Sequence, residues 1–123
     1  MPVVRHADAR RTTTPNATMT THASPTQGGS AQLAVWTVEM TPGAAGPPHT
    51  FDVEQVWTVL DGRVRADVDD EHHDLGPGDV LVLPAGAVRR VHAVDAFRAV
   101  VAAPAGARAT PVDGEPVLPP WIA

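Results

Sequence analysis

The sequence predicts an all-β domain, either a sandwich or a barrel of short strands. Its 123 residues suffice for one domain and leave no room for two. Turn-forming residues, 13 Pro and 10 Gly, divide the chain into short runs. These runs are rich in Val and other residues that favour strands, and no long segment has the spacing of an amphipathic helix. Together these features favour short strands joined by turns.

The predicted strands follow one another at turn-separated intervals. Residues 1–17 have no periodicity, and we expect them to form a flexible arm before a single domain at 18–123. The segment 63–68 has the clearest alternation of charged residues with Val and Ala, typical of a half-buried strand. A polar hairpin at 69–74 follows it. In all we expect roughly nine or ten strands, the main ones at 19–23, 32–40, 49–59, 63–68, 80–83, 88–94 and 97–103.

Composition excludes several kinds of chemistry. The chain has no Cys, no Tyr and no Lys, so cysteine nucleophiles, tyrosine acids and Schiff-base lysines are ruled out. A formal charge of −5 disfavours nucleic acid as a partner. The apolar runs are short and broken by Pro, so we expect no membrane segment and a soluble, cytoplasmic protein. All 9 basic residues are Arg, a bias that favours a bacterial source.

The densest polar cluster lies between Gly43 and Gly62. His49 and Gln55 fall within it, together with two carboxylates, just before an apolar strand and an Asp-Gly turn. A second segment, at 78–93, begins with Gly78 and carries a Pro-Ala-Gly break. Both segments contain glycines at their predicted turns, and glycine is the residue that most readily adopts the positive φ that such tight turns require.

These two segments resemble the two sequence motifs of the cupin superfamily. The family motifs read G-x5-H-x-H-x3,4-E-x6-G and G-x5-P-x-G-x2-H-x3-N, and the glycine and proline positions match at 43–62 and 78–93. The resemblance covers about residues 32–102. It implies a cupin-like double-stranded β-helix, that is, a jelly-roll barrel, with a pocket at its mouth.

The resemblance also implies where a metal would bind, and this chain departs from that pattern. In the family, two His and a Glu of the first motif and a His of the second hold a divalent metal. The corresponding residues here are His49, Phe51, Gln55 and Arg89. Phe cannot ligate a metal, and Arg is a permanently charged donor. We therefore expect either no cofactor or a divalent metal on His49 and Gln55, with the candidate additional ligands His92 and His22.

Other residues are candidates for the wall and chemistry of the pocket. Alternation places Phe51 and Trp57 on the same face as His49 and Gln55, and Met40 is a further candidate for ligand contact. Trp36 fits the core. Arg89 either holds an acidic or carbonyl-bearing ligand or pairs with a nearby carboxylate, Glu54 or Asp52.

Two classes of function fit these residues. One is a proton-transfer enzyme, an isomerase, epimerase or cyclase, in which His49 moves the proton and Arg89 holds an enolate or carboxylate. The other is a noncatalytic cupin that binds or senses a small ligand, and a metal-dependent cupin enzyme with atypical ligands is a third reading. We further expect a homodimer, because an apolar sheet face pairs well with its copy, and we expect Trp121 to pack at a barrel end or across subunits.

Overall fold

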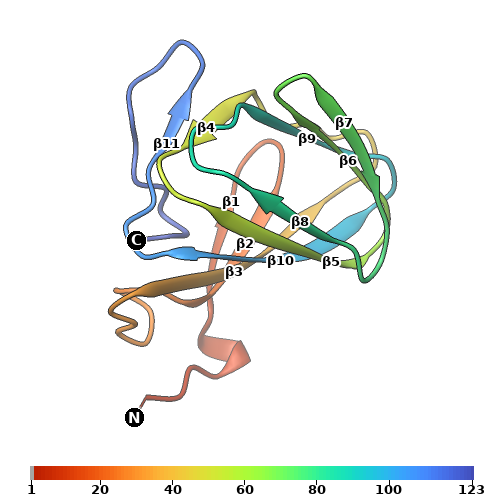
Figure 1. The fold of residues 1–123 in the computed structure, drawn as a ribbon. Helices are drawn as coiled ribbons and strands as arrows, with labels where there is room; N and C mark the ends of the chain where they lie inside the picture. Colours follow the sequence, from red (N-terminus) through yellow and green to blue (C-terminus); the bar gives the residue numbers. More distant parts are fainter. Residues whose placement is uncertain (1) are drawn as a thin grey trace.

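Two antiparallel sheets form the fold in the computed structural model, which describes residues 2–123 (Figure 1). One sheet has six strands in the order β1-β2-β3-β10-β5-β8, and the other has five in the order β11-β4-β9-β6-β7. This confirms the all-β jelly-roll prediction. The elements are the 3-10 helix η1 (His6–Asp8) and the strands β1 (Arg10–Thr13), β2 (Thr18–Ala23), β3 (Leu33–Met40), β4 (His49–Phe51), β5 (Gln55–Asp61), β6 (Val64–Val68), β7 (Glu71–Leu75), β8 (Val80–Leu83), β9 (Arg89–Ala93), β10 (Phe97–Pro104) and β11 (Ala109–Pro111).

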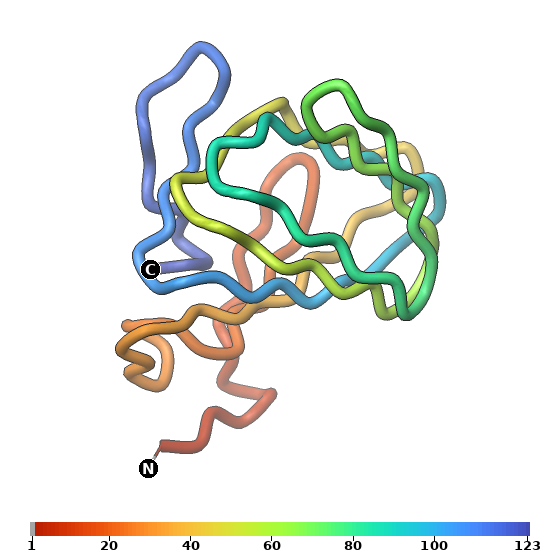
Figure 2. The backbone as a smooth tube through the Cα atoms, in the orientation of Figure 1, coloured from red at the N-terminus to blue at the C-terminus, as the bar shows by residue number. Residues whose placement is uncertain are grey.

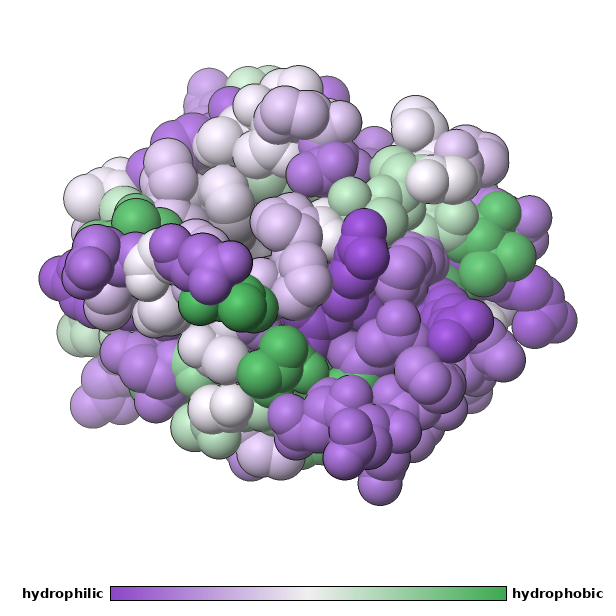
Figure 3. All heavy atoms as spheres, turned by 90° about the horizontal axis from the view of Figure 1, so that it is seen from above, coloured by the Kyte–Doolittle hydropathy of each residue, from purple (hydrophilic) through white to green (hydrophobic). Residues whose placement is uncertain are grey.

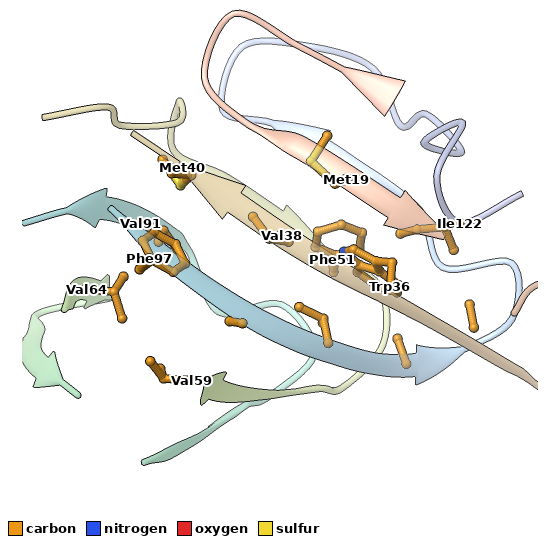
Figure 4. Packing of buried hydrophobic residues seen from close by; sticks show 14 of the residues in the cluster. Met19, Trp36, Val38, Met40, Phe51, Val59, Val64, Val91, Phe97 and Ile122 are labelled. Carbon is orange, nitrogen blue, oxygen red and sulfur yellow. The ribbon is translucent and has the colours of Figure 1, made fainter. Parts of the chain in front are cut away.

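The core lies between the two sheets and is built by strand alternation. Along β10, buried and less buried residues alternate from end to end, because successive side chains point to opposite faces. The same alternation runs through β6 and β9. Apolar side chains from both sheets therefore meet in one cluster (Figure 4), whose labelled members are Met19, Trp36, Val38, Met40, Phe51, Val59, Val64, Val91, Phe97 and Ile122.

The Asp-Gly turn after β5 explains why the first motif ends in glycine. Gly62 has φ +78°, a conformation that residues with a side chain rarely adopt. A Cβ atom on Gly62 would lie 2.0 Å from the carbonyl oxygen of Ala96 and 2.8 Å from Cα of Phe97. The turn between β5 and β6 thus passes directly against the start of β10, which leaves space only for glycine.

The structure differs from the predicted flexible arm over residues 10–13. These residues form β1, which pairs antiparallel with β2 and places Arg10 opposite Thr21. Arg and Thr occupy all four positions of β1, so no alternation of apolar residues marks the strand. Pairing of the backbone at the sheet edge, rather than burial of side chains, joins this part of the arm to the barrel (Figure 2).

The C-terminal tail folds back onto the barrel (Figure 2). The Thr21 hydroxyl donates a 2.7 Å hydrogen bond to the carbonyl oxygen of Trp121, and Ile122 is fully buried. Two backbone hydrogen bonds also join Val117 to Ala109 at 2.8 and 2.9 Å. The tail is therefore part of the barrel wall.

The outer surface is mixed in polarity. Seen from above, hydrophilic side chains surround separate apolar ones (Figure 3). The predicted hairpin at 69–74 turns at Asp69 and Asp70, and its second half is strand β7, from which His72 reaches the Asp67 carboxylate on β6 at 2.6 Å. Within residues 2–123 there is no helix with the length and apolar character needed to cross a membrane.

Candidate functional site

Three strands bring the matching positions of the two motifs together. β4 carries His49 and Phe51, and β5 begins with Gln55. Arg89 begins β9 and lies directly opposite His49 in the β4–β9 pairing. Residues from two segments of the chain about 35 positions apart thus converge at one end of the barrel.

A cavity of about 360 Å³ opens beside these residues. His49, Phe51, Gln55, Trp57 and Met40, all expected at the pocket, line it. The turn between β1 and β2 and the C-terminal tail close the remaining sides, and the wall is mostly apolar. The other lining residues are Thr14, Asn16, Ala17, Met19, Trp36, Val38, Gly46, Pro47, Val91, Ala109, Pro111, Val117, Pro119, Pro120 and Trp121.

A second hollow, of about 410 Å³, lies where β3 ends and β10 begins, and Met40 lines both this hollow and the first cavity. Arg98 and Asp61 line it and form an exposed ion pair, with Nη2 and Oδ2 3.1 Å apart. Neither of the unpartnered buried side chains described below reaches this hollow. The chemistry is therefore concentrated at the first cavity.

Gln55 is held in one orientation by two donors. Its Oε1 accepts a hydrogen bond from Nη1 of Arg89 at 3.1 Å and another from Nε1 of Trp57 at 3.2 Å. Guanidinium and indole groups can only donate, so the carboxamide oxygen must face them. The amide nitrogen Nε2 then has no hydrogen-bond partner among residues 2–123, although the side chain is only 1% exposed.

Arg89 is a buried cation without a carboxylate. It is 1% exposed, its guanidinium lies 5.1 Å from the centre of the Phe51 ring, and Nε donates to the carbonyl oxygen of Ala87 at 3.3 Å. None of the ion pairs formed within residues 2–123 includes it, and Nη2 has no partner there. Burial lowers the pKa of Arg89 to about 10, opposed by the charge of Asp69.

The position of Arg89 differs from both sequence interpretations. It does not line the cavity but lies behind Gln55 and Phe51. It also does not pair with the two carboxylates considered, because Asp52 accepts the backbone N–H of Arg108 and Glu54 is exposed. Arg89 therefore acts on a ligand in the cavity by its charge and through Gln55, and not by contact.

His49 presents a neutral imidazole to the cavity. Its Nδ1 lies 2.9 Å from the carbonyl oxygen of Pro47, which can only accept, so Nδ1 carries a proton, and in the neutral ring that the lowered pKa favours Nε2 keeps a lone pair. Burial lowers the pKa of His49; the bond to Pro47 opposes this and the charge of Arg89 adds to it. The Phe51 ring packs edge-on against the imidazole, with centroids 5.5 Å apart.

These residues do not fit a divalent metal. The oxygen of Gln55 is already used by Arg89 and Trp57, and a guanidinium stands where a fourth ligand would be needed. Across residues 2–123, no three His, Cys, Asp or Glu side chains are placed to hold a metal ion. His92 bonds to Asp67 at 2.9 Å and His22 to Thr37 at 2.5 Å, and neither lines the cavity.

Some lining residues were not predicted from the sequence. Trp121 lines the cavity, and Trp36, expected in the core, contributes to both core and wall. Thr14 and Asn16 reach the site from the segment expected to be a flexible arm. The only sequence feature that indicated a packed position for Trp121 was the apolar, Pro-rich tail around it, because an apolar segment tends to pack against another surface.

Two antiparallel sheets closed around an end cavity define a barrel protein of the jelly-roll class. Residues 36–103 match the family model of the cupin domain, more than half of the chain, and the protein belongs to the cupin family. A search of curated protein sequences finds no match to the chain.

Solved structures support the same fold. The polyketide cyclase RemF from Streptomyces resistomycificus has a TM-score of 0.77 at 22% identity, with 94% of this chain and 87% of that chain covered. KdgF from Halomonas sp. has a TM-score of 0.73 at 19% identity, with coverage of 85% and 93%. Bacillus subtilis oxalate decarboxylase, described with Mn(II) centres, has a TM-score of 0.72 at 18% identity, with coverage of 80% and 28%.

Proposed function

We propose that this cupin is a proton-transfer enzyme acting on a small, mainly apolar carbonyl compound, by isomerisation, epimerisation or cyclisation. The observation that carries the proposal is that one apolar cavity is lined by both His49, whose lowered pKa favours a neutral ring with a lone pair on Nε2, and Gln55, whose buried Nε2–H groups have no partner among residues 2–123. A base and a hydrogen-bond donor are the two groups that enolisation requires.

The chemistry divides between two side chains. Nε2 of His49 takes a proton from the carbon next to the carbonyl, and the C–H electrons move into a new C=C bond as the carbonyl oxygen becomes an enolate. Nε2 of Gln55 donates a hydrogen bond to that oxygen. The imidazolium then returns the proton to a different atom, or to the other face of the same carbon. No oxidant or reductant is needed.

The cavity favours ring systems. Its volume, about 360 Å³, lies at the lower end of the range of roughly 300 to 1,000 Å³ that is common for ligand pockets. Trp36, Phe51, Trp57 and Trp121 supply aromatic surface on several sides. The structural similarity to the polyketide cyclase RemF is in keeping with the cyclase form of the proposal.

A noncatalytic binding or sensing cupin is the second candidate. It is favoured by the scarcity of polar groups in the wall, since an aromatic cage with one acceptor and one donor is sufficient to hold a ligand. A metal-dependent enzyme is the weakest of the three readings, because Gln55 and Arg89 present donors rather than ligands.

Hydrogen exchange separates the first two candidates. 2-Tetralone, a bicyclic ketone, is incubated with the protein in deuterated buffer and loss of its α-proton signal is followed by NMR. We expect exchange to be faster with the wild type and to fall by about 100-fold or more with His49→Ala. His73→Ala is the control, since His73 lies on β7 away from the cavity. Saturable binding with no accelerated exchange would favour the noncatalytic candidate.

We also propose that the protein is a homodimer formed by the outer face of the six-stranded sheet. Val35, Ala102, Val56 and Val82 lie side by side across β3, β10, β5 and β8 and point away from the core. Val82 is 55% exposed on the edge strand. A second copy is the occupant that fits, because a flat row of small apolar side chains is self-complementary about a two-fold axis.

Light scattering tests the dimer. We expect a dimer mass for the wild type and a monomer mass for Val82→Glu, because the charge would be buried opposite its copy. Val94→Glu is matched in exposure, also 55%, but lies after β9 in the other sheet and should remain dimeric. A monomeric wild type at micromolar concentration would contradict the proposal.

A further inference from the structure

We propose that the cavity binds its ligand through an anionic oxygen, a phenolate or enolate, held by Gln55 with the buried cation of Arg89 behind it. This inference rests on the cavity and on the role given to Gln55 in the proposed function. It adds the charge of the bound ligand and assigns Arg89 as a positioning residue.

The orientation of Gln55 is the first argument. Both groups that contact its Oε1, Nη1 of Arg89 at 3.1 Å and Nε1 of Trp57 at 3.2 Å, are donors only. The carboxamide therefore cannot turn its oxygen toward the cavity without leaving two donors unpaired. A ligand atom that meets Gln55 must be an acceptor, so a carbonyl, hydroxyl or phenolate oxygen fits and an ammonium group does not.

The atoms without partners are the second argument. Besides Nε of Arg10 on β1, two buried nitrogens have no hydrogen-bond partner among residues 2–123, Nε2 of Gln55 and Nη2 of Arg89. Both are donors, and both belong to side chains only 1% exposed. Buried polar groups are nearly always paired in folded proteins, and of these two side chains only Gln55 lines the cavity, so its Nε2–H groups are the ones that a ligand can meet. The partner that they lack is an acceptor.

Charge is the third argument. The residues that line the cavity include no Asp or Glu, and His49 is the only titratable group among them. Arg89 lies behind the wall on β9, and the charge that opposes its burial comes from Asp69 in the exposed β6–β7 turn. The buried cation is therefore not neutralised locally. A negative oxygen at Gln55 would supply the opposite charge, at short range and away from water.

Arg89 acts through Gln55 rather than by contact with the ligand. Its Nη1–H bond polarises the carboxamide and makes the Nε2–H groups stronger donors, because chains of hydrogen bonds reinforce one another. Its position over the Phe51 ring, 5.1 Å from the ring centre, holds the guanidinium in place. Thus Arg89 fixes the direction of the amide together with Trp57, and its charge makes the local potential positive.

A chromophoric phenol provides the test. Bound 4-nitrophenol is titrated by absorbance, and 4-nitroanisole, its methyl ether, serves as the neutral analogue. We expect the pKa of the phenol to fall by about one unit on the wild type, equivalent to about tenfold tighter binding of the phenolate than of the phenol. His49, Arg89 and Asp69 are the charged or titratable groups near the site, so the titration is also run on His49→Gln.

Two variants remove the effect by different routes. Arg89→Met takes away the cation and replaces it with an apolar chain, a change that buried charges often tolerate. Gln55→Glu keeps the shape but places a carboxylate against Arg89, which cancels the charge and removes the donor. In both we expect the phenol pKa to return to its value in water or to rise above it, while 4-nitroanisole binds as before. Arg90→Met, changed at an exposed neighbouring residue, should behave as wild type.

The outcomes separate this inference from the proposed function. Thermal melting monitored by circular dichroism checks that each variant is folded. If 4-nitroanisole binds but the phenol pKa is unchanged on the wild type, or equally lowered on Arg89→Met, the anion inference is wrong and the cavity proposal stands. If neither compound binds, both fail.

Discussion

The two ends of the barrel interior differ in how their buried groups are satisfied. Around Val59, Val64 and Phe97 the core is wholly apolar, and these side chains are 1–3% exposed. At the other end, Gln55 and Arg89 are equally buried at 1%, yet each keeps a nitrogen without a partner. Figure 4 shows Val59, Val64 and Phe97 grouped away from Phe51 and Trp36.

The same strand serves both ends. β5 begins at Gln55, beside the cavity, and four residues later buries Val59 in the apolar cluster. Val59 thus contributes to the apolar core, while Gln55 is a buried polar group whose presence packing alone does not explain. The difference indicates that stability is concentrated at the apolar end and ligand recognition at the polar end.

The largest expected effect is at the apolar end, in Gly62→Ala. The new Cβ would lie 2.0 Å from the carbonyl oxygen of Ala96, and the residue would also keep a positive φ. We expect unfolding free energy to fall by roughly 3 kcal/mol or more, because the backbone of two strands must move apart. Urea denaturation followed by circular dichroism measures the change.

Gly78→Ala is the matched control for this substitution. Gly78 also has a positive φ, +88°, but a Cβ there meets nothing within 4 Å. We expect a loss of only about 1 kcal/mol, from the backbone conformation alone. Equal losses in the two variants would show that the contact with β10 adds nothing to the requirement for glycine at 62.

An intermediate effect is expected from two buried valines, one at each end. Val59 is packed on all sides in the apolar cluster, whereas Val38 lines the cavity. We expect Val59→Ala to cost about 2 kcal/mol and Val38→Ala about 1 kcal/mol, because a residue beside a cavity has fewer contacts to lose. Denaturation midpoints compare them, and a larger loss for Val38→Ala would reverse the assignment of the packed end.

Much of the fold could be predicted from the sequence because it depends on local rules. Gly62 was identified as a turn residue needing positive φ, and its φ of +78° confirms this. The alternation at 63–68 predicted a half-buried strand, and the structure has strand β6 at Val64–Val68. Strand β1 could not be predicted in this way, since it is held by backbone pairing and its Arg and Thr side chains show no apolar pattern.

Of the candidate site, only a set of residues could be predicted. Alternation along one strand at 49–59 predicted His49, Phe51, Gln55 and Trp57 on one face. The structure instead divides this segment into β4 and β5, which lie in different sheets, and all four residues line the cavity between them. The sequence could not show that Arg89 lies behind Gln55, because that depends on how β5 and β9, in different sheets, approach each other. Nor could it show Trp121 in the wall, since the path of the tail is set by tertiary contacts such as Thr21 to Trp121.

The smallest effect is expected at the polar end, in the pH dependence of stability. The pKa of His49 is lowered in the folded protein, chiefly by burial, so the unfolded chain binds more protons around the ordinary value near 6.5. The free energy of unfolding therefore decreases as the pH falls below about 6.5, because the unfolded chain takes up a proton on His49 before the folded protein does. The decrease continues until the pH reaches the lowered pKa of the folded protein. Glutamine cannot be protonated, so we expect the variant His49→Gln to lose less stability than the wild type between pH 8 and pH 5.

His22 also has a lowered pKa and is kept in both proteins, so the difference between their denaturation curves isolates His49. If the difference in unfolding free energy stayed constant with pH, or changed in the opposite direction, the imidazole would be as well solvated as in the unfolded chain. The polar end of the barrel would then lack the neutral base on which the proposed proton transfer depends.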